Sequence, residues 1–243
     1  MDMSTPEISL VIPVYNEVEN LSALAAEIRA AMEVVSRSWE VVFVDDGSTD
    51  GSLGRIRELA EECPHFRYIA FAANSGQSAA FAAGFREARG RLLVTMDADL
   101  QNDPADIPVM LAAYGRGGTT MVVGWRADRK DTLAKRLASK FGNAVRNLIS
   151  RENIRDTGCS LKVMEADMAR AIPVFNGAHR FFPTLMRLEG AVIAEVRVNH
   201  RPRASGVSKY GIWDRARKTV FDLLAVRWLQ NRHVSYTIRE RKA

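Results

Sequence analysis

The chain has few cysteines and no long apolar run. Its 243 residues include only two cysteines, Cys63 and Cys159, and these form no CxxC pair. This excludes a disulfide-built secreted scaffold and a cysteine zinc site, and we expect two buried thiols in a reducing compartment. No stretch reaches about eighteen uninterrupted apolar residues, and residues 1–6 show no signal peptide. We therefore expect neither export nor a membrane span.

A glycine-rich turn is also missing after the first apolar run. That run continues as Val11-Ile12-Pro13-Val14-Tyr15-Asn16-Glu17 and contains no GxGxxG pattern. A dinucleotide-binding fold needs those glycines at this point, because its backbone approaches a pyrophosphate there. The sequence therefore argues against a nicotinamide dehydrogenase.

Charge is distributed unevenly along an otherwise ordinary globular composition of 47% apolar and 26% charged residues. The net charge is +5, but residues 201–243 carry eleven Lys and Arg against three Asp and Glu, whereas residues 1–200 carry 23 against 26. A basic region favours an anionic neighbour, and nucleic acid and an acidic lipid surface both qualify on charge alone. We expect one domain over residues 1–212 and a basic amphipathic extension over residues 213–243.

Short apolar runs alternate with amphipathic stretches through the first half of the chain. Strands are expected at residues 8–14, 41–44, 68–71, 92–96 and 121–123, and helices at 20–35, 51–62, 76–89 and 104–114. This alternation predicts an α/β fold with a mostly parallel, Rossmann-like sheet flanked by helices. Further along, we expect helices at 131–149 and 181–189, an apolar stretch ending at Met164, a strand at 191–198 and a final helix at 212–229.

Polar clusters follow four consecutive predicted strands. They are Tyr15-Asn16-Glu17, Asp45-Asp46-Gly47-Ser48, Asn74-Ser75-Gly76-Gln77 and Asp97-Ala98-Asp99. Ligands of open parallel sheets gather beyond the carboxyl ends of the strands, so we expect these clusters to line one site. An Asp-rich turn with a helix cap would also explain the second cluster.

The fourth cluster predicts a divalent metal site. If the extended conformation of the strand continued, Asp97, Asp99 and Gln101 would lie on one side and three oxygens would converge. Mg²⁺ or Mn²⁺ is the natural occupant, and so sparse a protein shell implies that a phosphorylated ligand completes it. Asp-x-Asp pairs also occur in turns and helix caps, which leaves a purely structural interpretation open.

These motifs resemble the family-two glycosyltransferases of the GT-A fold. The stretches Asp97-Ala98-Asp99-Leu100-Gln101-Asn102, His200-Arg201-Pro202-Arg203 and Gly206-Val207-Ser208-Lys209-Tyr210-Gly211 are similar to the dolichyl- and undecaprenyl-phosphate sugar transferases. The resemblance covers about residues 8–212, and it implies an inverting, metal-dependent transfer of a sugar from a nucleotide diphosphate donor to a polyprenyl phosphate. A UDP-sugar is favoured as the donor. The glycolipid product would serve cell-envelope glycan or lipopolysaccharide modification.

The resemblance also implies roles for individual residues. The nucleotide would contact Pro13, Tyr15, Glu17, Asp45, Asp46, Asn74, Gly76, Gln77, Asp97 and Ala98. The metal would be held by Asp97, Asp99 and Gln101, and the catalytic set would be Asp97, Asp99, Arg126 and Asp156. The acceptor phosphate or the diphosphate would contact Arg126, Arg136, Arg203 and Lys209, although each of these cations singly is also explained as a solvated surface charge.

A phosphate acceptor changes what the protein must supply. A lipid monophosphate, with a second pKa of about 6, is already an anionic nucleophile near neutrality, so the difficulty is repulsion between two polyanions. Fixed cations then matter more than a base, and Asp156 would orient a cation or the sugar. In the alternative of a sugar-hydroxyl acceptor, Asp156 would have to be the general base.

The final predicted helix bears on membrane attachment. It places Trp213, Val220, Phe221, Leu224 and Trp228 near one face, which fits either core packing or an interfacial helix, and the helix at 131–149 has the same character. Many bacterial relatives carry two C-terminal membrane spans and this chain shows none. We therefore expect peripheral attachment at the cytoplasmic face of the membrane, directly or through a partner protein. The alternative from another class, a non-catalytic nucleic-acid-binding module, is set against the site-bearing strand ends, and no nucleic-acid partner is expected.

Overall fold

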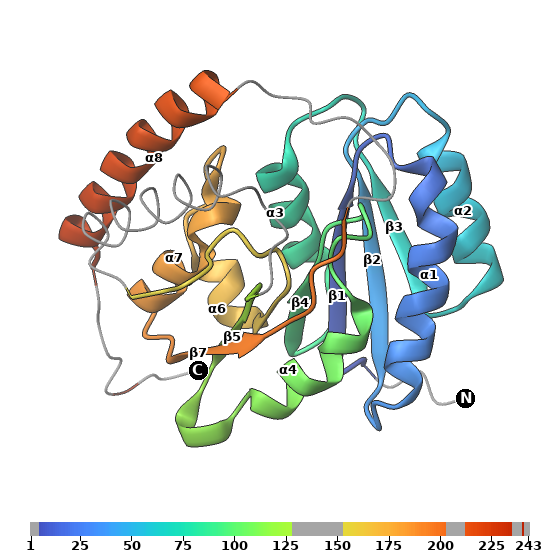
Figure 1. Ribbon diagram of the computed structural model, residues 1–243, viewed down its shortest axis with the longest axis horizontal. Coiled ribbons are helices and arrows are strands. Elements are labelled where there is room, and N and C mark those ends of the chain that lie inside the picture. Colours follow the sequence, from blue (N-terminus) through green and yellow to red (C-terminus); the bar gives the residue numbers. More distant parts are fainter. Residues whose placement is uncertain (1–4, 128–152, 203–211, 235–239, 241–243) are drawn as a thin grey trace.

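Figure 1 shows the computed structural model of the chain. The structure describes residues 5–127, 153–202, 212–234 and 240, and the side chains of residues 212–220 are not described. The predicted helix at 131–149 and the predicted phosphate ligands Arg136, Arg203 and Lys209 therefore lie outside the described residues.

A seven-stranded sheet forms the centre of the described part, in the order β3-β2-β1-β4-β6-β5-β7. Its strands are β1 (Ile8–Val14), β2 (Trp39–Asp45), β3 (Phe66–Ala70), β4 (Leu92–Thr95), β5 (Met121–Trp125), β6 (Lys162–Glu165) and β7 (Ile193–Arg197). Strand β6 runs antiparallel to both of its neighbours, and the other pairings are parallel. The predicted mostly parallel sheet is confirmed, and each predicted strand lies within two residues of an observed one at either end.

Helices cover both faces of the sheet (Figure 1). They are α1 (Val18–Glu33), α2 (Ser52–Glu62), α3 (Gln77–Glu87), α4 (Ile107–Ala113), α6 (Ala166–Ala171), α7 (Phe182–Leu188) and α8 (Ile212–Arg232), with 3-10 turns at Pro104–Asp106, Arg116–Gly118 and Ala178–Phe181. Strand β6 and helix α6 were not predicted. Both are very short, so neither shows enough periods of its pattern to be recognised.

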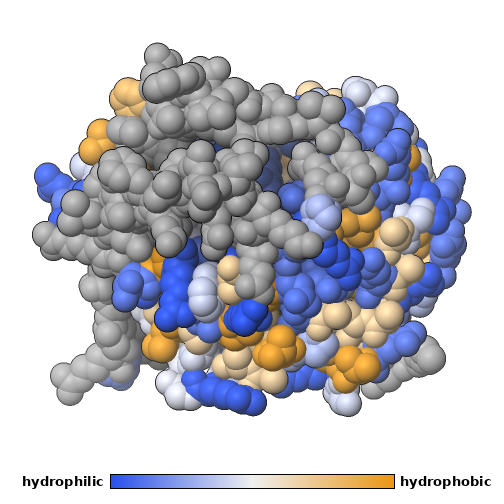
Figure 2. Space-filling model, viewed as in Figure 1, coloured by the Kyte–Doolittle hydropathy of each residue, from blue (hydrophilic) through white to orange (hydrophobic). Residues whose placement is uncertain are grey.

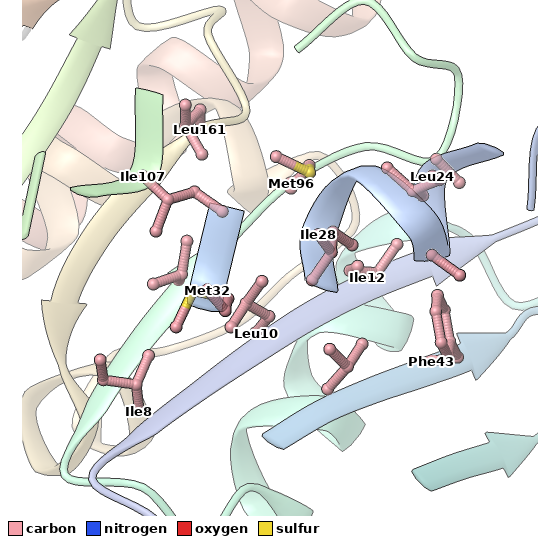
Figure 3. Close-up of a cluster of buried hydrophobic side chains, with 14 of the residues drawn as sticks. Ile8, Leu10, Ile12, Leu24, Ile28, Met32, Phe43, Met96, Ile107 and Leu161 are labelled. Carbon is pink, nitrogen blue, oxygen red and sulfur yellow. The ribbon is translucent and has the colours of Figure 1, made fainter. Parts of the chain in front are cut away.

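Successive residues of the central strands pack on opposite faces, which is why the strands read as continuous apolar runs. Ile8, Leu10 and Ile12 of β1 face Leu24 and Ile28 of α1, as Figure 3 shows. Intervening strand residues pack instead against α3, α6 and α7. This two-faced burial fixes the register of β1 and therefore fixes where its carboxyl end lies.

Close packing of α3 on β1 depends on one glycine. A Cβ atom at Gly84 would overlap the Val11 side chain and would lie 3.2 Å from Val44. Helix α3 therefore approaches the sheet closely, and its first residue Gln77 is held beside the end of β4. The two free cysteines, Cys63 and Cys159, are both buried, as predicted.

Helix α8 presents two kinds of apolar residue. Leu223 and Val226 are buried in the core that includes α7, whereas Phe221, Leu224 and Trp228 are 66%, 57% and 62% exposed. Core packing therefore does not account for these three side chains of the predicted stripe. Figure 2 shows a face on which the described surface is mostly hydrophilic with small separate hydrophobic patches. Within the described residues, no helix combines the length and the apolar character that crossing a membrane requires.

Candidate nucleotide and metal site

The loops after β1 and β2 are joined by side-chain to backbone hydrogen bonds. The Asn16 amide donates to Ser48 Oγ at 3.0 Å, and the Thr49 amide donates to Asn16 Oδ1 at 2.8 Å. Asn16 has a φ of 56°, a left-handed conformation that asparagine tolerates better than most residues. The Glu17 amide donates to Ser52 Oγ at 2.9 Å, and Glu17 Oε2 accepts from the Asn20 side chain. These contacts hold the predicted nucleotide residues of the first loop against the second.

Asp46 joins the loop after β3 to the same assembly. Its carboxylate is buried and accepts hydrogen bonds from Asn74 Nδ2 at 2.9 Å, the Ser75 amide at 2.7 Å and the Gly76 amide at 2.9 Å. Gly47 allows the two loops to approach, because it has a φ of 70° and a Cβ atom there would lie 2.5 Å from the Ala73 carbonyl carbon. The structure thus brings Asp46, Asn74 and Gly76 together, with the Asp46 carboxylate acting as the connection.

Asp45 differs from Asp46 in its hydrogen bonding. Its Oδ2 atom accepts from the Ser48 amide at 3.2 Å, whereas Oδ1 is buried and accepts no hydrogen bond from the described residues. Buried carboxylate oxygens almost always have a donor, so this atom is an exception that asks for a ligand. Pro13 pairs with Val44 in the sheet, one residue before Asp45.

The acidic loop after β4 does not continue the strand. Strand β4 ends at Thr95, and Leu100 has a left-handed φ of 61°. The argument that Asp97, Asp99 and Gln101 share a side by strand alternation is therefore wrong, because the extended conformation on which it depends is interrupted. Gln101 contributes its backbone amide instead, which donates to Asp99 Oδ1 at 3.2 Å.

Asp97 and Asp99 form an electrostatically unfavourable pair. Burial raises the pKa of the Asp97 carboxyl, and the neighbouring Asp99 charge raises it further, while nearby donors and cations offset part of the rise. Gln77 Nε2 donates to Asp97 Oδ1 at 2.6 Å, so the third loop contacts the acidic loop directly. A divalent cation would relieve the repulsion between the two carboxylates, and their oxygens suit Mg²⁺ or Mn²⁺.

Asn102 anchors the acidic loop and was not predicted as a site residue. Its buried Oδ1 accepts from Ser160 Oγ at 2.6 Å and from the Asp97 amide at 3.4 Å. Arg201 fixes the other end of the loop. Its amide donates to Gln101 O at 3.0 Å, and its guanidinium pairs with Glu27 at 2.7 Å and Asp103 at 2.8 Å. The segment that leads into the basic 203–211 region therefore begins directly beside the acidic loop.

Arg126 and Asp156, both predicted to be catalytic, form a bidentate ion pair. Arg126 Nε lies 2.7 Å from Asp156 Oδ2, and Nη2 lies 2.9 Å from Oδ1. Although burial lowers the pKa of the guanidinium, the hydrogen bonds to Asp156 raise it overall. Both carboxylate oxygens are thus engaged by a permanent cation, an arrangement that orients the arginine.

A cavity of about 170 Å³ opens beside Asp97, and we refer to it as the Asp97 cavity. Its lining includes Lys162 and His179, which were not predicted as site residues. Burial lowers the pKa of Lys162, which donates to Cys159 O. Burial, Arg180 and Lys162 together lower the pKa of His179 to about 3. The sequence signal for Lys162 was a single charge within the apolar run that ends at Met164.

Metal ligation within the described residues rests on few side chains. No cluster of three or more His, Cys, Asp or Glu side chains placed to hold a metal ion occurs among them. Two adjacent carboxylates match the habit of Mg²⁺, which takes one or two carboxylates and completes its shell with water and substrate phosphates.

Two curated relatives are similar over most of the chain. Dodecaprenyl-phosphate galacturonate synthase of Rhizobium johnstonii is 40% identical over 224 residues, which are 90% of this chain and 66% of that protein. Undecaprenyl-phosphate 4-deoxy-4-formamido-L-arabinose transferase of Pectobacterium carotovorum is 36% identical over 204 residues, which are 84% of this chain and 62% of that protein. The chain thus spans slightly less than two thirds of the length of each.

Solved structures and a family model agree with the predicted GT-A fold. Mannosyl-3-phosphoglycerate synthase from Rubrobacter xylanophilus has a TM-score of 0.70 at 19% identity and covers 97% of this chain and 77% of its own. Glucosyl-3-phosphoglycerate synthase from Mycobacterium tuberculosis, in complex with Mn²⁺ and UDP-glucose, has a TM-score of 0.68 at 18% identity over 91% of this chain and 79% of its own. At such identities the likeness shows the fold. The model of glycosyl transferase family 2 matches residues 9–172, and the chain therefore belongs to that family.

Proposed function

We propose that this chain is an inverting glycosyltransferase that moves a sugar from a nucleotide diphosphate donor, a UDP-sugar, to a polyprenyl phosphate. The observation that carries the proposal is the acidic pair Asp97 and Asp99 beside both a nucleotide-binding set of loops and a cavity. Both curated relatives are named for transfer involving a dodecaprenyl or undecaprenyl phosphate, which supports this acceptor class.

The nucleotide would lie across the first three loops. Asp45 Oδ1, a buried acceptor without a described donor, suits an N–H group of a base such as uracil. Tyr15 offers a flat ring, and Glu17 and Asn74 offer polar groups at the same edge of the sheet. Asp46 acts indirectly, since its hydrogen bonds hold the third loop in place.

Asp97 and Asp99 would hold Mg²⁺ or Mn²⁺ together with the donor's phosphates, with Gln101 as a further proposed ligand. A bound divalent ion supplies electrostatic stabilisation of the departing diphosphate. The residues fit such an ion because the Asp97 pKa is raised by burial and by Asp99, so the pair lacks a counter-charge of its own. Asn102 and Ser160 keep the acidic loop in the conformation that presents both carboxylates.

The acceptor phosphate would be met by cations and would need no base. Arg126, oriented by Asp156, is the described cation best placed for this task. Arg203 follows Arg201 by two residues, and Arg201 is fixed beside the acidic loop, which supports Arg203 as a second phosphate ligand. Arg136 and Lys209 stay predictions. The engagement of both Asp156 oxygens by Arg126 speaks against Asp156 as a general base, and hence against a hydroxyl acceptor.

Attachment to the membrane surface is part of the proposal. Residues 1–212 would form the catalytic domain, and residues 213–243 a basic amphipathic extension. Phe221, Leu224 and Trp228 expose an apolar stripe on α8, and the basic residues of the extension would face anionic lipid headgroups. A position at the cytoplasmic face and a membrane partner protein stay predictions.

The direct test is a transfer assay with a panel of UDP-sugars, undecaprenyl phosphate and either Mg²⁺ or Mn²⁺, with glycolipid detected by mass spectrometry. We expect a product that requires the metal, and we expect Asp99→Ala to lose transfer while its circular dichroism stays that of the wild type. Asp167→Ala is the matched control, because that carboxylate is exposed on α6 and lies outside the site. No metal-dependent glycolipid from any common donor, or full turnover in Asp99→Ala, would contradict the proposal.

A further inference from the structure

The Asp97 cavity carries more positive than negative charge. Among the described residues that line it, Lys162 and Arg180 are cationic and Asp97 is the one carboxylate. Asp97 already accepts a hydrogen bond from Gln77 and, in the proposed function, faces the metal ion. The nearby Asp156 is paired with Arg126, so that pair adds no net charge. A group that enters the cavity therefore meets two cations whose charge the lining does not balance.

Lys162 is held at the floor of the cavity by the sheet itself. It begins β6, lies opposite Thr95 of β4, and is only 3% exposed. Its ammonium group donates to Cys159 O, and an ammonium group has three donors in all. A buried lysine is costly unless an anion faces it, so its presence in a cavity of this size points to a ligand that brings negative charge.

His179 registers the same positive field. Its ring lies between the two cations, and burial, Arg180 and Lys162 together depress the pKa to about 3, which keeps the imidazole neutral. The ring is positioned by a hydrogen bond of 2.9 Å between Nδ1 and Ser78 Oγ. An anionic group placed among these three side chains would relieve the repulsion between the cations.

We propose that the donor sugar carries a carboxylate, as a uronic acid does, and that Arg180 and Lys162 recognise that carboxylate in the Asp97 cavity. Neutral sugars present mainly hydroxyl groups, whose hydrogens need acceptors, and carboxylates are the strongest acceptors a protein offers. This lining supplies cations instead. The inference rests on the proposed function, because it takes the cavity as the site of the donor's sugar.

Matched donor pairs test the inference by binding, without any need for turnover. UDP-galacturonate and UDP-galactose differ only in a carboxylate against a hydroxymethyl group, and UDP-glucuronate and UDP-glucose differ in the same way. Each donor, and UDP alone, is titrated calorimetrically into the full chain with Mn²⁺. We expect at least one uronate to bind about tenfold or more tightly than its neutral partner, as a charge-assisted contact implies.

Variants then assign the preference to the cavity. Arg180→Gln should reduce the ratio of the two affinities towards one, and Arg180→Lys should restore most of it. Arg187→Gln, which removes a charge from an exposed position of α7, should leave the ratio unchanged. Equal or tighter binding of both neutral donors in the wild type, or an unchanged ratio in Arg180→Gln, overturns the inference and leaves the proposed function standing. Failure of UDP and all four donors to bind overturns the proposed function and the inference together.

Discussion

The buried imidazole of His179 makes a quantitative prediction about acid stability. Its pKa lies near 3 in the folded chain, whereas the ordinary value is 6.5. Below about pH 6.5 the unfolded chain therefore binds a proton that the folded chain does not, and the free energy of unfolding falls as the pH is lowered towards 3. The limiting slope is about 1.4 kcal/mol per pH unit. Between about pH 7 and pH 5 the loss from this one group is about 2 kcal/mol.

His179→Gln separates this loss from every other titration. Glutamine cannot take up the proton but can still form a hydrogen bond with Ser78, so the variant should be less sensitive to acid than the wild type by about 2 kcal/mol. Urea unfolding followed by tryptophan fluorescence at the two pH values gives this difference directly. His233→Gln is the control, because that imidazole is exposed and its removal should leave the wild-type pH dependence in place. Equal declines in the wild type and His179→Gln would refute the reasoning.

Three further predictions concern the site. Asp156→Asn should weaken the orientation of Arg126 and raise the KM for the polyprenyl phosphate about tenfold with a smaller change in kcat, whereas loss of kcat at unchanged binding would identify a base. Gly47→Ala should lower the free energy of unfolding by about 2 kcal/mol or more, because its Cβ meets backbone. Gly115→Ala, which has a positive φ but no neighbour within 4 Å, should cost about 1 kcal/mol, and equal costs would show that only the backbone strain matters. Mn²⁺ with UDP should raise the thermal midpoint of the wild type and not that of Asp99→Ala, and the same rise in both would remove the metal from that carboxylate.

The parallel half of the sheet was legible because its strands are buried on both faces. An unbroken apolar run such as residues 8–14 has few alternatives once turn and helix signals bound it, and β1 is observed over the same residues. The position of the first four site loops then follows from topology, since parallel strands place their carboxyl ends at one edge. Residues such as Asp46 and Asn74 could thus be assigned to one site. That Asp46 holds the loop of Asn74 internally could not be read, because a motif gives no hydrogen-bond partners.

The acidic loop shows where strand periodicity fails. Alternation predicts the direction of a side chain only while the backbone stays extended, and β4 ends at Thr95, well before Gln101. The left-handed Leu100 carries no sequence signal, because leucine does not favour that conformation. The conformation is set by tertiary contacts instead, above all by Asn102 and its bond from Ser160, which lies 58 residues further along the chain.

Lys162 was missed for a related reason, and that reason is informative. A charge in an apolar run weakens the case for a strand when only burial is considered, because a buried ammonium group is unfavourable. The strand forms nonetheless: Val163 and Met164 are fully buried, and the polar surroundings of the Asp97 cavity accommodate the lysine at its end. The chain therefore accepts an electrostatic cost at the position nearest the acidic loop. In a fold this consistent elsewhere, a local violation of that kind marks the place where a ligand's charge completes the balance.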